Sequence, residues 1–265
     1  MTSAERRSLL VRARDGAVSV TPESAGWRYV TFSVVRVARG GRHVVSTQRS
    51  ETCVVMLAGR CSVRGDASFD GVGDRASPFD GPPHAVYAPP GATLELCAVD
   101  GDLDIAIGSA PATKGAMLRH IAPREVRRET RGRGAMERTI HHILMEDAAA
   151  ETLLVTEVIT PAAHWSSYPP HKHDANDPPR ETQLEETYYH RLRDPRGFAV
   201  QRVYTADRSL DETIAVRDGD LVLVPRGYHT VSAAPGYELY YLNVMAGPVR
   251  RWCVTFDPDH DWLRR

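Results

Sequence analysis

Lysine is almost absent from this sequence of 265 residues. Of its 33 basic residues only Lys114 and Lys172 are lysines, and the others are arginines. A mechanism that begins with a Schiff base therefore has few candidate residues. The formal net charge of −1 also leaves no basic surface of the kind that binds nucleic acid or an anionic membrane. We expect neither nucleic acid nor a membrane as a partner.

Long apolar runs are missing as well. No segment is long and apolar enough to span a bilayer, and residues 1–11 lack the continuous apolar core of a signal peptide. The cysteines show no Cys-x-x-Cys spacing and lie in apolar, strand-like segments. We expect them to be small buried hydrophobic residues: Cys53, Cys61, Cys97 and Cys253. These absences predict a cytoplasmic protein.

Nucleotide-binding loops are also absent, since neither Gly-x-Gly-x-x-Gly nor a phosphate-binding loop occurs. What recurs instead are short runs rich in Val, Ile, Tyr and Thr, separated by Gly, Pro and Asp. This spacing is typical of all-β sandwiches and barrels. The expected strands are 27–37, 53–58, 61–63, 85–88, 93–99, 104–107, 152–159, 186–190, 200–204, 213–216, 221–224 and 239–244.

The chain is long enough for two modest domains, and its halves resemble each other faintly. Segments 80–91 and 221–227 both end in a strand followed by a Pro-x-Gly turn, and an apolar strand follows each of them. An internal duplication of one barrel is the simplest explanation. The Arg-, Gly- and Pro-rich segment 109–138 reads as a connector, which predicts domains 1–115 and 116–265.

The segment 168–190 carries the most informative motif. In the run Tyr-Pro-Pro-His-Lys-His-Asp, strand alternation directs His171 and His173 to one side and Lys172 to the other. The next strand brings Glu186 beside them. Two imidazoles and a carboxylate suit a divalent transition metal, and His229, after a Pro-x-Gly turn, could complete the site. The N-terminal half has no His-x-His and no later Glu in register, so we expect a barrel without a metal there.

The strand that carries Glu186 contributes further polar groups. Tyr188 and His190 share its face by alternation, whereas Glu185 should face away unless the strand contains a bulge. Tyr241 and Asn243 lie at alternate positions of the last strand and are candidates to line the same pocket.

The order His-x-His, Glu, then Gly-x5-Pro-x-Gly-x-His resembles the two-part motif of the cupin superfamily. Longer strings are more specific: Ser-Ser-Tyr-Pro-Pro-His-Lys-His-Asp from Ser166, Glu-Glu-Thr-Tyr-Tyr-His-Arg from Glu185, Gly-Phe-Ala-Val-Gln-Arg-Val-Tyr from Gly197, and Tyr-Tyr-Leu-Asn-Val-Met-Ala-Gly from Tyr240. They resemble the 5-deoxy-glucuronate isomerases of myo-inositol catabolism. The likeness runs through the C-terminal half and is weaker in the N-terminal half.

This resemblance implies a bicupin, two tandem jelly-roll barrels with few short helices. It also implies a metal held by His171, His173, Glu186 and His229, most often Zn²⁺, although Mn²⁺ or Fe²⁺ would accept the same ligands. Thr230 stands where the family pattern suggests proline; this changes the turn and leaves the ligand set intact.

The implied reaction converts 5-deoxy-D-glucuronate to 5-dehydro-2-deoxy-D-gluconate, an aldose–ketose isomerisation. A base and a proton shuttle must come from nearby side chains, and Tyr188, His190 and Glu186 are the candidates. The substrate carboxylate calls for an arginine, for which we name Arg202, Arg191 and Arg226, with Tyr241 and Asn243 as further contacts.

Three alternatives stay open at this point. The same ligands could serve the related uronate ketol-isomerase of pectin breakdown, an iron-dependent cupin dioxygenase, or a cupin that binds a sugar without turnover. Oxygen consumption and metal identity distinguish the dioxygenase. Exposed sheet edges and a barrel without a site favour a homo-oligomer.

Overall fold

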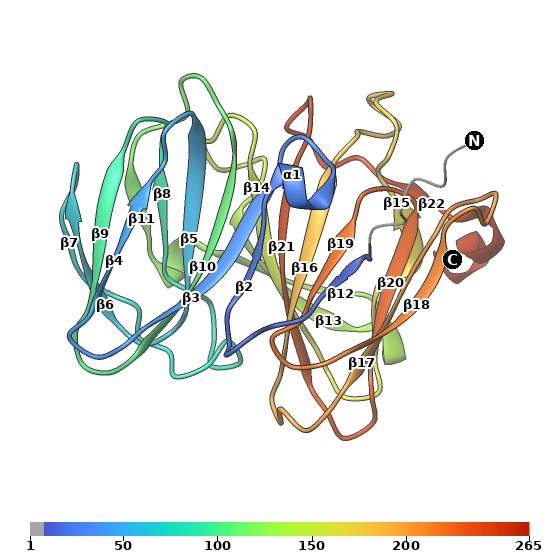
Figure 1. Ribbon diagram of the computed structural model, residues 1–265. Coiled ribbons are helices and arrows are strands. Elements are labelled where there is room, and N and C mark those ends of the chain that lie inside the picture. Colours follow the sequence, from blue (N-terminus) through green and yellow to red (C-terminus); the bar gives the residue numbers. More distant parts are fainter. Residues whose placement is uncertain (1–7, 265) are drawn as a thin grey trace.

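Two β-barrels make up the computed structural model, which describes residues 8–264 (Figure 1). Residues 1–7, where the segment tested for a signal peptide begins, lie outside the described residues. Every strand range expected from the sequence overlaps an observed strand. The prediction of an all-β fold is therefore confirmed.

The N-terminal barrel consists of a six-stranded and a four-stranded sheet. The six-stranded sheet has the order β11 (Arg119–Ile121), β8 (Ala85–Ala88), β5 (Ser50–Ala58), β10 (Leu103–Pro111), β3 (Thr31–Val37) and β2 (Val18–Val20). The four-stranded sheet has the order β4 (Arg42–Ser46), β9 (Thr93–Ala98), β6 (Cys61–Gly65) and β7 (Phe69–Val72).

The C-terminal barrel repeats this plan with a seven-stranded and a five-stranded sheet. The larger sheet has the order β1 (Leu10–Val11), β19 (Leu221–Val224), β16 (Glu185–Leu192), β21 (Leu239–Ala246), β14 (Leu154–Thr160), β13 (Arg138–Leu144) and β12 (Arg127–Arg131). The smaller sheet has the order β18 (Asp211–Val216), β17 (Ala199–Tyr204), β20 (Tyr228–Ala233), β15 (Trp165–Lys172) and β22 (Thr255–Phe256).

Helical segments are short and few. They are α1 (Pro22–Ala25) and the 3-10 segments η1 (Pro123–Glu125), η2 (Gly134–Met136) and η3 (Pro258–Arg264). No helix among residues 8–264 is long and apolar enough to cross a membrane.

The connector predicted at 109–138 is more regular than its composition suggests. It contains β11, which pairs with β8, and β12, which pairs with β13. Strand pairs hold it in place, so its description as a linker was wrong over these parts. The boundary at residue 115 stays a prediction, and two pairings cross it: β11 joins the N-terminal barrel, and β1 adds to β19 of the C-terminal barrel.

The two barrels have the same strand pairing just before their Pro-x-Gly turns. Thr52 pairs with Ala88 just before the turn Pro89-Pro-Gly91, as Glu186 pairs with Val224 just before the turn Pro225-Arg-Gly227. The N-terminal barrel therefore has threonine where the C-terminal barrel has its inward-facing carboxylate. This register supports the duplication that the sequence suggested.

Three apolar layers stabilise the molecule. One fills each barrel, and the third lies between them, where the two large sheets pack face to face. At the centre of the third layer β10 and β21 approach so closely that a Cβ on Gly108 would lie 2.7 Å from Cγ2 of Val244. Glycine is thus required there by the close packing of the two sheets.

Two buried glutamates tie the barrels together in both directions. Glu51 of β5 accepts hydrogen bonds from the backbone N–H groups of residues 151, 152 and 153 in the C-terminal half. Glu185 of β16 accepts them from the backbone N–H groups of residues 28, 29 and 30 in the N-terminal half. Each carboxylate thereby satisfies donors that would otherwise be buried without partners.

A buried ion pair crosses the same interface. Arg75 donates to Glu157 from both terminal nitrogens, at 2.9 and 3.0 Å, and His141 and Tyr240 also hydrogen bond to this carboxylate. Burial by itself would raise the pKa of Glu157, but the charge of Arg75 and these hydrogen bonds hold it below its ordinary value. The carboxylate is therefore charged at the centre of the interface.

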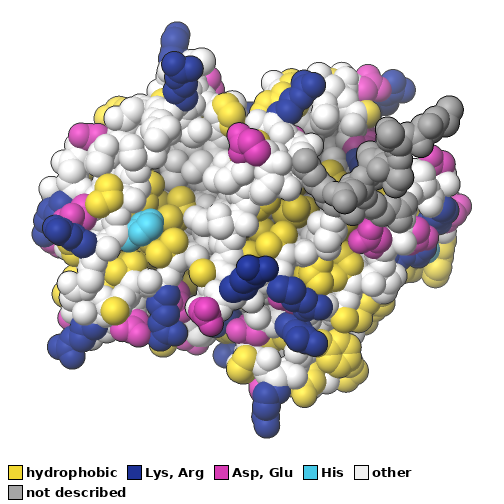
Figure 2. All heavy atoms as spheres, in the orientation of Figure 1, with side chains coloured by type: hydrophobic (Ala, Val, Ile, Leu, Met, Phe, Trp, Pro, Cys, Tyr) yellow, Lys and Arg dark blue, Asp and Glu magenta, His cyan; other side chains and the backbone are white. Residues whose placement is uncertain are grey.

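On the face shown in Figure 2, charges of both signs lie next to each other. Many belong to exposed ion pairs such as Arg36 with Asp102 and Arg196 with Asp194. All four cysteines are free thiols; Cys53 and Cys61 are buried as expected, whereas Cys97 and Cys253 are half-buried.

Replacing Arg75 by methionine should lower the free energy of unfolding by about 3–5 kcal/mol, because it leaves the Glu157 carboxylate without its guanidinium partner in a buried site. Urea denaturation followed by circular dichroism measures this loss. Arg64→Met is the matched control: it breaks the exposed pair with Asp70 and should cost at most about 1 kcal/mol. Equal losses in the two variants would contradict the importance assigned to the buried pair.

Candidate metal centre

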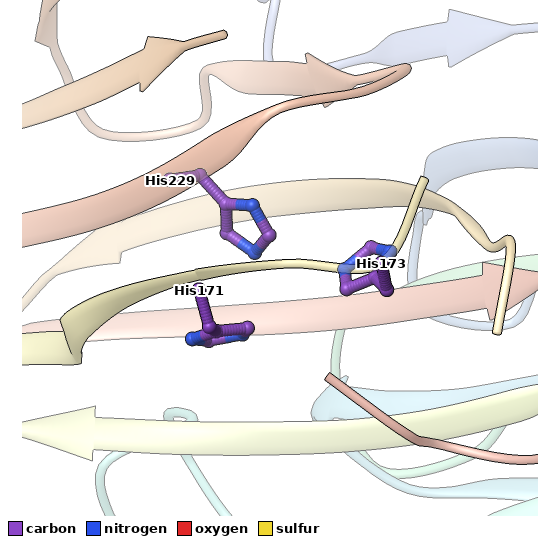
Figure 3. A group of neighbouring side chains, drawn as sticks. All are labelled: His171, His173 and His229. Atoms are coloured by element: carbon purple, nitrogen blue, oxygen red, sulfur yellow. The ribbon is translucent and has the colours of Figure 1, made fainter. Parts of the chain in front are cut away.

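Three histidines converge inside the C-terminal barrel. His171 lies on β15, His173 directly follows this strand, and His229 lies on the neighbouring β20, where it pairs with His171. One ring nitrogen from each lies within 4.8 Å of the others, and all three side chains are buried (Figure 3). The predicted histidines are thus brought together.

The Pro-x-Gly turn before β20 positions His229. Gly227 has a positive φ of 90°, and a Cβ there would lie 2.6 Å from the carbonyl oxygen of Tyr204. Its N–H donates to Asp174, which fixes the turn to the loop after His173. The residue after His229, Thr230, donates from its hydroxyl to the carbonyl of Ser166, so threonine ties β20 to β15 here.

Glu186 on β16 faces the histidines. Its Oε2 lies 2.9 Å from Nε2 of His173 and 3.1 Å from Nε2 of His229. Burial would raise the pKa of Glu186, but the hydrogen bond from His173 and the charges of both histidines lower it to about 2. The carboxylate is ionised and available as a ligand at neutral pH.

The hydrogen bonds behind the histidines show that a cation fits this site. Nδ1 of His173 donates to the carbonyl of Leu184, and Nδ1 of His229 donates to the carbonyl of Gly227. Nε2 is therefore the ring nitrogen of each that faces the Glu186 carboxylate, and this arrangement of donor atoms is attractive when a proton or a metal ion lies between them. Nε2 of His229 is buried and makes no hydrogen bond with any residue in 8–264.

A cavity of about 100 Å³ opens beside these ligands. Besides His171 and Glu186, it is lined by Tyr188, Tyr241 and Asn243, as the strand alternation predicted. Glu185 faces away from the cavity as expected, and the tyrosines next to Tyr188 and Tyr241, which are Tyr189 and Tyr240, also point outward to the other barrel.

Two serines on β15 support the cavity tyrosines. Ser166 lies 2.5 Å from the hydroxyl of Tyr241, and Ser167 lies 2.8 Å from the hydroxyl of Tyr188. Consecutive residues can both face inward because β15 loses its regular register here, and Ser167 has a positive φ of 50°.

His190 shares the face of Tyr188 but lies deeper. It is fully buried, its Nε2 lies 2.8 Å from Oε1 of Gln201, and it is absent from the cavity lining. Burial lowers the pKa of His190 to about 4, so the ring is neutral. The geometry therefore favours Tyr188 over His190 as the group next to a bound substrate.

None of the three predicted arginines lines the cavity. Arg191 faces outward and pairs with Asp218, Arg202 pairs with Asp211 on the next strand, and Arg226 is exposed in the turn before His229. Strand alternation explains the placement of Arg191 and Arg202, because on β16 and β17 the residues directly before and after each arginine are the ones that face inward. A carboxylate in the cavity needs another cation.

The residues with basic side chains that line the cavity and that sequence reasoning missed are Arg131, Arg138 and His142. All lie on the β12–β13 hairpin, within or next to the segment taken as a connector. Alternation in Arg138-Thr-Ile-His-His142 was the available signal, since Arg138, Ile140 and His142 all line the cavity. The arginine-rich composition hid it.

The KduI/IolB family model matches residues 7–263. The chain belongs to the KduI/IolB family. Its curated relatives include the 5-deoxy-glucuronate isomerase of Geobacillus thermodenitrificans, which is 51% identical over 93% of this chain and 90% of the relative. That of Bacillus subtilis is 42% identical over 92% of this chain and 91% of the relative. The family resemblance seen in the sequence is confirmed.

The fold is shared by the solved structure of an IolB-like protein and by those of more distant proteins. An IolB-like protein from Salmonella typhimurium is 44% identical, covers 97% of this chain and 100% of its own, and superposes with a TM-score of 0.94. An oxalate decarboxylase from Lactobacillus farciminis is only 14% identical, yet it covers 92% of this chain and 85% of its own with a TM-score of 0.65. The two-barrel likeness confirms the predicted bicupin.

In this KduI/IolB chain, His171→Ala, His173→Ala and His229→Ala should each reduce bound divalent metal from about one ion per chain to a small fraction of it, because each removes one donor of a four-donor site. Elemental analysis of purified, dialysed protein measures the change. His43→Ala, on β4 of the other barrel, should keep the wild-type content. Unchanged metal content in the three variants would place the ion elsewhere.

Proposed function

We propose that this protein is a metal-dependent isomerase that converts 5-deoxy-D-glucuronate to 5-dehydro-2-deoxy-D-gluconate in myo-inositol degradation. The observation that carries the proposal is the extent of the likeness to the 5-deoxy-glucuronate isomerases, 51% identity over 93% of the chain. The cavity supports it independently, because it combines a four-donor ligand set with hydroxyl and imidazole groups suited to proton transfer.

Zinc is the proposed ion. His171, His173, His229 and Glu186 would hold it, a nitrogen and oxygen set that zinc accepts, although Mn²⁺ and Fe²⁺ accept it too. The bound ion would supply a Lewis acid that polarises the aldehyde oxygen of the substrate, without any redox change.

Tyr188 is proposed as the proton donor. Burial raises the pKa of Tyr188 well above its ordinary value, so the phenol stays protonated at neutral pH. Its hydroxyl lies at the cavity with the hydroxyl of Ser167 2.8 Å away, and the serine can donate a hydrogen bond to the phenolate that forms when the phenol gives up its proton. The isomerisation needs such a donor, because the aldehyde oxygen becomes a hydroxyl group.

His142 is proposed as the base that removes the proton from the carbon next to the aldehyde. Its Nε2 lies 2.9 Å from a carboxylate oxygen of Glu129, and Nδ1 has no hydrogen-bond partner in 8–264. Burial lowers the pKa of His142, so the ring is neutral at pH 7 and Nδ1 can accept a proton. The same nitrogen can return that proton to the former aldehyde carbon, while the neighbouring hydroxyl becomes the ketone and gives its proton to the phenolate that Tyr188 leaves, so that both groups end as they began.

Anaerobic turnover of 5-deoxy-D-glucuronate tests the proposal. The purified protein should form the keto acid without oxygen, lose activity on chelation, and regain it when a divalent ion is added. Formation of the product is followed by proton NMR, with elemental analysis of the same sample.

Three other results would redirect the assignment. Turnover that requires oxygen, with oxygen uptake, would indicate the cupin dioxygenase. Bound metal without turnover of this substrate, but with turnover of a pectin-derived uronate, would indicate the related ketol-isomerase. Binding without turnover of either would indicate a sugar-binding cupin.

Tyr188→Phe and His142→Gln should each lower kcat roughly 100-fold or more while bound metal is retained, since each removes a proton-transfer group. Steady-state kinetics and metal analysis are measured together. Tyr189→Phe is the matched control, because this tyrosine is next on the strand but packs outward on Phe32. An active Tyr188→Phe enzyme would exclude the phenol as donor.

Three predictions from the sequence complete this proposal. They are a cytoplasmic location, assembly into a homo-oligomer, and an N-terminal domain of residues 1–115 without a metal beside a C-terminal domain of residues 116–265. Size-exclusion chromatography with light scattering measures the assembly.

A further inference from the structure

Arg138 is a buried cation at the cavity without a carboxylate partner. The residue is 8% exposed, and within residues 8–264 it takes part in no ion pair. Its Nη1 donates to the backbone carbonyl of Met136 at 2.9 Å and to that of Tyr168 at 3.4 Å. The remaining donors of the fork are left for the cavity, which Arg138 lines.

A second arginine directly opposes it. Arg131 pairs with Arg138 across the β12–β13 hairpin and lines the same cavity. Like charges in this position repel each other. Glu129 compensates Arg131 by two hydrogen bonds, at 2.7 and 2.9 Å, and also bonds to His142, so Arg138 remains without compensation.

A buried charge without a partner is costly, and the cost is offset when a ligand of opposite sign binds. Burial indeed lowers the pKa of Arg138. A guanidinium keeps its charge under these conditions, and its planar fork matches the two oxygens of a carboxylate.

The position of Arg138 relative to the candidate metal ligands suits a small substrate. The carbonyl of Tyr168 that anchors Arg138 lies three residues before His171, and His171, Glu186 and Arg138 line one cavity. A short chain that has its carbonyl group at the ligands and an acid group at its other end could engage both.

We propose that Arg138 binds the carboxylate of the substrate and thereby selects sugar acids over neutral sugars. The inference rests on the proposed function for the identity of the substrate, but the subsite itself is defined by the uncompensated arginine. It replaces Arg202, Arg191 and Arg226 as the arginine for this task.

Calorimetric binding of D-gluconate and of its neutral counterpart D-glucitol to the metal-loaded protein tests the subsite without turnover. The wild type should prefer gluconate. Arg138→Gln should weaken gluconate binding roughly 10- to 100-fold, as expected for the loss of charge-assisted hydrogen bonds, and leave glucitol binding nearly unchanged. Arg138→Lys keeps the charge but loses the fork, so its affinity for gluconate should lie between those of the wild type and of Arg138→Gln.

Arg64→Gln, an exposed arginine of the N-terminal barrel, serves as the control and should keep the preference. Melting temperature and metal content identify a variant that fails to fold, and Arg138→Lys then carries the test. A wild type that does not distinguish the two ligands, or a folded Arg138→Gln protein that keeps the wild-type preference, overturns the proposal. Gluconate selectivity without turnover of 5-deoxy-D-glucuronate would instead contradict the proposed function and leave the subsite intact.

Discussion

The packing of the two large sheets against each other is the constraint on which the rest of the molecule depends. Apolar side chains fill this layer, and three carboxylates are buried in or beside it: Glu51, Glu185 and Glu157. Each is satisfied from the opposite barrel, by backbone N–H groups or by Arg75. Because an unpaired buried carboxylate is so costly, these contacts specify one relative placement of the barrels.

That placement lets β16 serve two purposes at once. Its outward residues, Glu185 and Tyr189, hold the N-terminal barrel, while Glu186 and Tyr188 face the candidate metal centre. The two-residue period of a strand makes this division possible. The duplicated register shows how the barrels diverged in use: at the position of Glu186 the N-terminal barrel has Thr52, and both barrels keep the outward glutamate that ties them together.

Charge is distributed unevenly around the cavity. Glu186 and the histidines form a group that a cation completes. Arg138 on the β12–β13 hairpin is a group that an anion completes, since its neighbour Arg131 is already paired with Glu129. A uronate carries a polarisable carbonyl and a carboxylate, which are complementary to these two groups. Tyr188 and His142 line the same cavity, with the hydroxyl and imidazole groups of the proposed proton transfer.

The sequence alone determined the β class, the strand and Pro-x-Gly turn that both halves share, the four candidate ligands that the structure brings together and the inward tyrosines, because strand alternation and the turn act over a few residues. Only the tertiary structure decided which arginine side chains line the cavity. Arg191 and Arg202 have nearby acidic partners that local sequence does not reveal, and Arg138 reaches the cavity because its hairpin extends the sheet beside β14. Such contacts depend on which strands become neighbours, and an arginine-rich segment looks the same in sequence whether it is solvated or buried.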